Sequence, residues 1–277
     1  MPRVDLRDKP IAITGASSGI GAATAIACAR AGMPVVIGAR RLDKLEDVAA
    51  TIRAEGGRAE VVQCDVTNEP DNAALIDKAI ESFGSIYAVF ANAGVGLEKP
   101  LAESSDKDLR DIFEINFFST MHTIRAALPH MIEAQRGHIL ICSSCLARFA
   151  LPLNSAYSAT KAAQHHIGRA LNVELAPHNI RVSTIHPIGT RTELFEIAHK
   201  RAGPDAVKMP PHSPDRFMQD PSVVANAIVR CLHKPRPEVW TSFFVRYGMA
   251  LAAFVPRISD RAVAGMVREY EAAKRTP

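Results

Sequence analysis

The segment Thr14-Gly15-Ala16-Ser17-Ser18-Gly19-Ile20-Gly21 lies between the first short apolar run of the chain and its first helical stretch. Glycines allow the backbone to turn tightly and to approach a pyrophosphate, and the N-terminus of a helix offers free N–H groups and the positive end of a dipole. A glycine triplet alone is a weak signal, but its position between a predicted strand and a predicted helix raises its value. The segment therefore predicts a loop that binds the phosphates of a dinucleotide.

Short apolar runs rich in β-branched residues alternate with longer helical patterns along the chain. Such alternation is typical of βαβ units around a parallel sheet. The predicted strands cover residues 11–14, 34–37, 59–63, 86–90, 138–142, 181–185 and 238–241. They are apolar almost throughout, as expected where helices cover both faces of a sheet. The sequence predicts an α/β fold, with one doubly wound domain over residues 1–277 and a seven-stranded parallel sheet flanked by helices.

The predicted helices cover residues 19–31, 43–55, 70–83, 106–134, 154–176, 221–233 and 260–274. Ser105, followed three residues later by Asp108, resembles a capping box at the start of the longest one. Residues 193–219 are rich in proline, histidine and charge and lack a clear period. A long irregular segment at this place often covers an active site, so we expect a substrate lid, with a plain surface loop as the alternative.

Composition excludes several classes of protein. The net charge of +4 is mild and the basic residues are scattered, apart from Arg40-Arg41, so no nucleic-acid surface is predicted. Five cysteines at irregular spacing do not form a disulfide framework, and the polar residues 1–9 do not resemble a signal peptide. We therefore expect a reduced, cytoplasmic protein.

Two short motifs resemble metal or redox sites. Cys142-x-x-Cys145 has redox spacing but no second pair that could complete a zinc site. His165-His166 lacks the spacing of four that places two ligands on one helix face. We expect no metal.

Two further motifs follow the glycine segment in order. Asn92-Ala93-Gly94 follows the fourth predicted strand, and Tyr157-x-x-x-Lys161 follows the fifth. With the spacing G-x-x-x-G-x-G, the three motifs are specific, and over residues 9–195 the chain resembles the short-chain dehydrogenase/reductase family. The resemblance implies a Rossmann fold, a nicotinamide cofactor and hydride transfer to or from a carbonyl or alcohol.

Tyr157 and Lys161 are four residues apart in a predicted helix and therefore share one face. A tyrosine has an ordinary pKa of about 10, and lowering it to about 7 requires roughly 4 kcal/mol of phenolate stabilisation. A fixed ammonium and an oxidised nicotinamide can supply this together. We expect Tyr157 to be the general acid and base, and Lys161 to lower its pKa and to bond the nicotinamide ribose.

The resemblance implies roles for two more polar residues. Ser144 matches the family's serine that orients and polarises the reacting oxygen, and its neighbour Ser143 is the lesser candidate. Asn116 matches the helix asparagine that completes the family's catalytic tetrad. It is expected to hold a water molecule that links Lys161 to solvent.

The second predicted strand ends in Gly38-Ala39-Arg40-Arg41, without the acid that NAD-binding versions of this fold use to hold the ribose 2′-hydroxyl. A guanidinium instead binds a 2′-phosphate through charge-assisted hydrogen bonds. Arg40 is the first choice for this contact and Arg41 the second, with capping of the next helix as the alternative role. The sequence predicts NADP(H) rather than NAD(H).

The resemblance implies the remaining cofactor contacts, with Asp65 at the adenine and Asn92 and Gly94 in a turn under the ribose. An architectural role for Asn92, tying neighbouring strands together, is the alternative. Where the family has Pro-Gly, this chain has Pro187-Ile188, and Thr192 matches the family's cofactor-contacting threonine, with Thr190 as a competing candidate. The complete set expected to contact the cofactor is Gly15, Ser17, Ser18, Gly19, Ile20, Gly21, Arg40, Arg41, Asp65, Val66, Asn92, Ala93, Gly94, Tyr157, Lys161, Pro187, Ile188, Thr190 and Thr192.

The residues expected to form the wall of the pocket are mostly apolar, which favours a hydrophobic ketone, aldehyde or secondary alcohol over a sugar. They are Val95, Leu97, Leu146, Phe149, Leu151, Leu194 and Phe195. A non-catalytic NADPH-binding sensor or regulator is the alternative function. A nucleotide-sugar epimerase is disfavoured by the glycine spacing and the length of the chain.

Residues 239–255 are apolar and aromatic, but they are fewer than the ~20 residues needed to span a bilayer. We expect them in the core or at a dimer interface, with a pocket wall or a peripheral membrane contact as the alternatives. With the helix that follows, they form an expected C-terminal helical extension over residues 239–277. We expect a homo-oligomer, a dimer rather than a tetramer.

Overall fold

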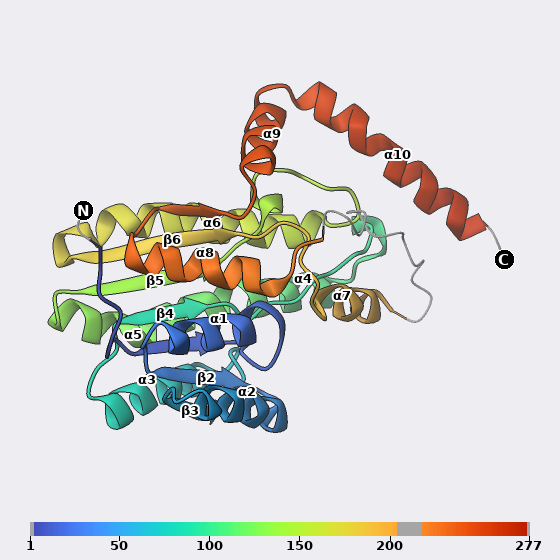
Figure 1. The fold of residues 1–277 in the computed structure, drawn as a ribbon. Helices are drawn as coiled ribbons and strands as arrows, with labels where there is room; N and C mark the ends of the chain where they lie inside the picture. The colour runs from blue at the N-terminus through green and yellow to red at the C-terminus, as the bar shows by residue number, and fades with distance from the viewer. Residues whose placement is uncertain (1–2, 204–217, 276–277) are drawn as a thin grey trace.

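The computed structural model describes residues 3–203 and 218–275, in which seven strands form one parallel sheet (Figure 1). The strands are β1 Ile11–Thr14, β2 Val35–Ala39, β3 Ala59–Gln63, β4 Ala88–Ala91, β5 Gly137–Cys142, β6 Ile180–His186 and β7 Glu238–Trp240. Their order is β3-β2-β1-β4-β5-β6-β7, which reverses direction between β1 and β4. Ligands of such sheets bind beyond the carboxyl ends of the strands at this reversal. The predicted doubly wound fold is confirmed.

Helices connect the strands and extend beyond the last one. They are α1 Gly19–Arg30, α2 Leu42–Ala54, α3 Glu69–Phe83, α4 Asp106–Phe113, α5 Ser119–Glu133, α6 Ser155–Glu174, α7 Leu194–Ala202, α8 Pro221–His233, α9 Phe243–Phe254 and α10 Pro256–Arg275. Short turns of other types are η1 Leu101–Glu103, η2 Glu114–Phe118, η3 Cys145–Ala147 and η4 Ala176–His178.

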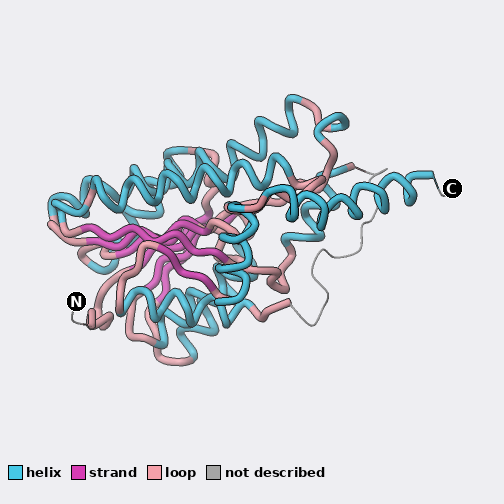
Figure 2. Tube along the Cα trace, turned by 90° about the horizontal axis from the view of Figure 1, so that it is seen from above, coloured by secondary structure: helices cyan, strands magenta, loops and turns pink. Residues whose placement is uncertain are grey.

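The sheet lies between two layers of helices (Figure 2). Side chains alternate along each strand, so Ile11 and Ile13 pack with α1, α2 and α8, whereas Ala12 of the same strand packs with α3 and α5. All three of these side chains are fully buried. Because both faces of the sheet are covered in this way, each strand is apolar along its whole length.

The long helix predicted over residues 106–134 begins as expected but is interrupted. Ser105 Oγ accepts a hydrogen bond from Asp108 N (3.1 Å), and an Asp108 carboxylate oxygen accepts one from Ser105 N (2.9 Å), which completes the capping box. A π turn, η2, then separates α4 from α5 and contains Asn116. Such turns occur frequently at functional sites.

Two expectations for the second half of the chain are wrong in part. Residues 193–219 are not irregular throughout, because α7 forms within them, while 204–217 lie outside the described residues. Within residues 239–255, Val239 of β7 joins the core, but the rest is not a core segment. After β7 the chain forms α9, on which Phe244 is 86 % exposed. None of the described helices combines the length and the apolar character that crossing a membrane requires.

Candidate active site

Tyr157 and Lys161 lie on the buried face of α6, with exposed fractions of 9 % and 4 %. Lys161 Nζ is 5.6 Å from the centroid of the Tyr157 ring. The ammonium donates hydrogen bonds to the backbone oxygen of Cys142 (2.8 Å), at the carboxyl end of β5, and to Gln164 Oε1 (2.9 Å). The lysine is therefore held beside the tyrosine at the edge of the sheet where a ligand is expected.

The net effect of the protein's own groups is to raise the pKa of Tyr157. Burial raises its pKa, because an ionised phenolate loses hydration there, and a hydrogen bond from Ser144 offsets only part of this effect. Burial also lowers the pKa of Lys161. The expected lowering of this pKa by Lys161 together with an oxidised nicotinamide stays a prediction, because the protein's own groups are only part of that pair.

Ser144 is the second residue after β5 and caps the turn η3, where its Oγ accepts a hydrogen bond from Leu146 N (3.1 Å). Its backbone oxygen accepts a hydrogen bond from His186 Nδ1 (2.9 Å), so this ring nitrogen carries the proton. The His186 ring stacks on Trp240, with centroids 4.3 Å apart, and burial lowers its pKa to about 4. A neutral histidine that the sequence analysis did not single out therefore fixes the backbone of Ser144.

Asn116 is fully buried, and its side chain bonds to the backbone rather than facing solvent. Its Oδ1 accepts from Val95 N (2.8 Å), and its Nδ2 donates to Val95 O and to Thr160 Oγ1 (both 3.0 Å). Its backbone oxygen accepts from Gln164 Nε2 at 2.6 Å. The Gln164 side chain thus connects Lys161 to Asn116. The water molecule that Asn116 is expected to hold between Lys161 and solvent stays a prediction.

Gln164 was missed by the sequence analysis, although one signal was present. It follows Lys161 by three positions and therefore lies on the same face of α6. A polar side chain on a face that carries a buried lysine has to bond to something inside the protein.

The glycine loop packs directly on the turn Asn92-Ala93-Gly94. Gly15 has a φ of +64°, and a Cβ there would lie 2.8 Å from the Cα of Ala93. Asn92 Nδ2 donates to the backbone oxygens of Thr14 (3.0 Å) and Gly15 (3.2 Å), which ties the ends of β1 and β4 together. This is the architectural role considered for Asn92.

Gly94 lies beside Lys161. A Cβ at Gly94 would be 3.5 Å from Lys161 Nζ and 3.1 Å from Asn116 Oδ1. The missing side chain leaves room for a group to approach the ammonium.

At the end of the glycine loop, Ser18 precedes α1 without a side-chain cap, so the first N–H groups of the helix can bind phosphate. These residues fit a dinucleotide.

Arg41 lies against the glycine loop, whereas Arg40 is exposed. Arg41 Nη2 donates to Ser17 Oγ and Ser18 Oγ (both 3.0 Å) and to Glu193 Oε2 (2.8 Å). The sequence analysis did not identify Glu193, because its partner Arg41 lies 152 positions away in the chain. The ion pair joins the end of the β6–α7 segment, just before α7, to the glycine loop.

Asp65, the expected adenine contact, comes just after β3 with its carboxylate held in place. Its Oδ1 accepts from the backbone N (3.1 Å) and Oγ1 (2.8 Å) of Thr67. Burial alone would raise the pKa of Asp65, but these bonds, with Arg40 nearby, hold it below the usual value. Asp65 is therefore a charged acceptor.

The segment after β6 distinguishes the two candidate threonines. A Cβ at Gly19 would lie 2.9 Å from Thr192 Cγ2, so Thr192 covers the glycine loop. Thr190 is turned inward, where its Oγ1 donates to Ile188 O (2.8 Å) and accepts from Gln219 Nε2 (3.0 Å). Thr192 is the better placed of the two for a cofactor contact.

Apolar side chains surround Tyr157. Buried with it are Val95, Leu97 and Ile112, and partly buried against this cluster are Phe113, Ile115, Leu146, Ala156, Leu194 and Ile197. Phe195, an expected wall residue, is 43 % exposed.

Helix α10 reaches the turn η1, where Tyr270 Oη donates a hydrogen bond to Glu103 Oε2 (3.0 Å).

The family model for short chain dehydrogenases matches residues 9–202, so the chain belongs to the short-chain dehydrogenase/reductase family. Over 193 residues the chain is 40 % identical to an uncharacterized oxidoreductase of Listeria innocua, covering 69 % of this chain and 78 % of the relative. The resemblance inferred from three motifs is thereby confirmed.

Two solved structures extend the comparison. A 7α-hydroxysteroid dehydrogenase complexed with NADH and 7-oxo glycochenodeoxycholic acid is 32 % identical, with a TM-score of 0.74 over 83 % of this chain and 89 % of the other. An alcohol dehydrogenase from the archaeon Thermococcus sibiricus complexed with 5-hydroxy-NADP is 29 % identical, with a TM-score of 0.71 over 84 % and 95 %. Similar chains therefore bind either form of the nicotinamide cofactor.

Proposed function

We propose that this protein is an NADP(H)-dependent oxidoreductase that acts on a hydrophobic carbonyl compound or secondary alcohol. The observation that carries the proposal is the placement of Tyr157, Ser144 and Lys161 together at the carboxyl edge of the sheet, beside the gap left by Gly94. A nicotinamide cofactor bound along this edge supplies or accepts the hydride.

The chain's own residues position the reacting oxygen and move its proton. Ser144 Oγ orients the carbonyl, and the protonated Tyr157 donates to its oxygen during reduction. Lys161, held by Cys142 and Gln164, would hold the cofactor ribose through its ammonium and stabilise the phenolate that forms. Because burial raises the pKa of Tyr157, its phenol form is available to donate the proton that reduction requires.

The preference for NADP(H) rests on two arginines at the end of β2. Arg41 already presents its guanidinium to the serines of the glycine loop, and Arg40 is exposed next to it, near Asp65. No acid stands at the end of β2 to repel a 2′-phosphate. The solved structures do not decide the matter, because one holds NADH and the other an NADP derivative.

The apolar surroundings of Tyr157 support a hydrophobic substrate. Polar groups of a sugar would be left without partners against Val95, Leu97 and Leu146. The similar hydroxysteroid dehydrogenase, whose structure holds an oxo bile acid, agrees with this substrate class.

The test offers the protein NADPH and a panel of apolar ketones and aldehydes, and measures the oxidation of NADPH by its absorbance. Tyr157→Phe is expected to lower kcat by about 100-fold or more while NADPH binding, followed by fluorescence, is kept. Tyr87→Phe is the matched control, because Tyr87 precedes β4 and lies at the opposite edge of the sheet. Full turnover by Tyr157→Phe would refute the mechanism. NADPH binding without turnover of any carbonyl by the wild type would favour the sensor.

A further inference from the structure

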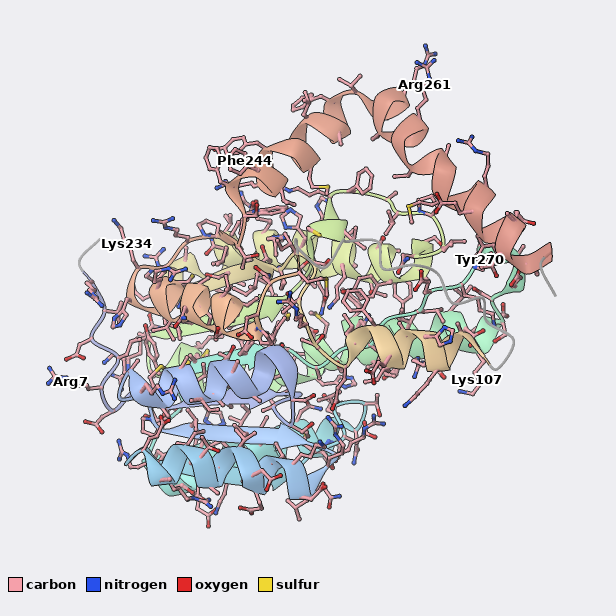
Figure 3. The ribbon with its side chains drawn as sticks, turned by 45° about the vertical axis from the view of Figure 1, so that its right-hand side comes forward. Arg7, Lys107, Lys234, Phe244, Arg261 and Tyr270 are labelled. Carbon is pink, nitrogen blue, oxygen red and sulfur yellow. The ribbon has the colours of Figure 1, made fainter. Side chains whose placement is uncertain are left out.

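Helix α9 carries its largest apolar side chains toward solvent. Phe243 is 68 %, Phe244 86 %, Leu251 66 % and Phe254 85 % exposed. The helix stands out from the body of the protein before α10 turns back (Figure 1), and Phe244 lies on its outer side (Figure 3). Ordinary protein surfaces expose large apolar side chains singly, whereas a contiguous group of them marks an interaction site.

The exposed side chains form one continuous face. At ~100° per residue, they fall within an arc of about 120° around the helix. We call them the α9 face, and its members are Phe243, Phe244, Tyr247, Leu251, Phe254 and Val255. A face of this width is enough to bury one side of a helix.

Positive charge accompanies the α9 face, and negative charge does not. Between residues 239 and 259 the chain has two arginines, Arg246 and Arg257, and no aspartate or glutamate. Both arginines are exposed, as is Arg261 one turn further along α10, which points away from the protein (Figure 3). Asp260 is the first acid of this region.

We propose that the α9 face docks on an anionic lipid bilayer, lying along its surface. Aromatic side chains enter the headgroup boundary, while arginines extend their charge to lipid phosphates. The strength of surface binding increases with both features, and α9 with the start of α10 has both. The inference does not depend on the proposed function.

A second copy of the chain is the less suitable occupant. A two-fold interface places a surface against itself, so the arginines of both copies would approach one another with no acid between residues 239 and 259 to neutralise them. Anionic headgroups neutralise them instead.

The position of α9 also suits a bilayer. Helix α9 packs on η3, which follows Ser144, and α10 runs from α9 to Glu103 in η1. Docking through α9 would therefore bring the loops around the candidate active site close to the lipid surface.

The test is flotation of the full chain with vesicles of phosphatidylcholine alone, or of phosphatidylcholine and phosphatidylglycerol in equal parts. We expect binding to the anionic vesicles only, weakened by salt. The variant F243S/F244S/F254S should lose about 100-fold or more in partitioning, because three aromatic side chains no longer leave water. R246Q/R257Q should lose about 10-fold or more.

L42S/V173S is the matched control, since these exposed apolar residues lie on α2 and α6, and it should bind as the wild type does. Circular dichroism checks folding, and F244S alone replaces the triple variant if that one does not fold. Absent flotation, or equal binding to neutral vesicles, would overturn the proposal. So would a wild-type dimer in light scattering that F243S/F244S/F254S converts to a monomer while neither binds vesicles.

Discussion

Lys161 Nζ donates a hydrogen bond to Gln164 Oε1 over 2.9 Å, deep inside the protein. The Nε2 of the same carboxamide donates to the backbone oxygen of Asn116 (2.6 Å) and to Thr120 Oγ1 (2.8 Å). Burial already disfavours the charged form of Lys161, so each acceptor that remains stabilises its ammonium. Gln164 is therefore a positioning residue, which acts on Tyr157 through the lysine.

Replacing Gln164 by methionine should keep the volume of the side chain and remove these bonds. We expect kcat to fall about 10- to 100-fold, the range for a lost bond to a charged group. The alkaline limb of the kcat profile should move to lower pH, because Lys161 then loses its proton more readily. Thr120→Val, which leaves the Lys161–Gln164 bond intact, should change neither. An unchanged pH profile in Gln164→Met would show that the bond is only structural.

The raised pKa of Tyr157 predicts opposite pH dependences for the two directions of the reaction. Proton donation needs the phenol, so reduction should be constant across neutral pH and decline only in alkali. Alcohol oxidation needs the phenolate, so its rate should be low at neutral pH and rise with pH. Initial rates in both directions, measured in one buffer series, test this. Oxidation that is already maximal at neutral pH would mean that the bound cofactor overcomes the effect of burial.

The parts of the fold and site that the sequence predicted are those with a local pattern. Apolar runs between helices define a parallel sheet, and ligands of such a sheet gather at its carboxyl edge, so Ser144 and Tyr157 could be expected together. The spacing of four between Tyr157 and Lys161 predicts a shared helix face without any knowledge of the tertiary structure.

The features that were missed depend on residues distant in the sequence. Glu193 matters only because Arg41 lies next to it in space, and His186 only because Trp240 stacks on its ring. The apolar composition of α9 did not reveal which side is exposed, since a core helix and a docking helix are equally apolar. The π turn at Asn116 has no sequence signal comparable to a cap.

Cofactor choice can be tested at the end of β2. Arg40→Asp should shift the ratio of kcat/KM for NADPH over NADH toward NADH by about 100-fold or more, because a carboxylate repels the 2′-phosphate and accepts a bond from a 2′-hydroxyl. Arg125→Asp makes the same charge change at an exposed arginine of α5 and should leave the ratio unaltered. A preference that survives Arg40→Asp would leave Arg41 as the phosphate ligand.

The ion pair between Arg41 and Glu193 predicts a second effect on cofactor binding, smaller than that of Arg40→Asp. Both side chains are partly exposed, at 42 % and 37 %, so the pair contributes little to stability. Glu193→Gln removes a negative charge near the arginines and should tighten NADPH binding by about 2- to 5-fold, without changing NADH binding. Titration of cofactor fluorescence measures both dissociation constants. Equal changes for the two cofactors would show that Glu193 acts on the loop rather than on the 2′-phosphate.

Three buried histidines make the fold sensitive to acid. Burial lowers the pKa of His138 to about 3 and those of His165 and His186 to about 4, from an ordinary value of 6.5. The unfolded chain therefore takes up protons first, and the stability present above 6.5 is lost as the pH falls toward these lower values. Between about pH 7.5 and about pH 5.5, each histidine should cost roughly 1 kcal/mol of unfolding free energy.

Thermal unfolding across this range measures the slope. His186→Phe keeps a ring against Trp240 but cannot be protonated, so its Tm should start lower, because the bond to Ser144 is lost, and then fall less steeply with acid. His130 lies on α5 outside the buried core, so His130→Phe should keep the wild-type dependence of Tm on pH. If His186→Phe lost stability with acid as steeply as the wild type, protonation of this ring would not be part of the cause.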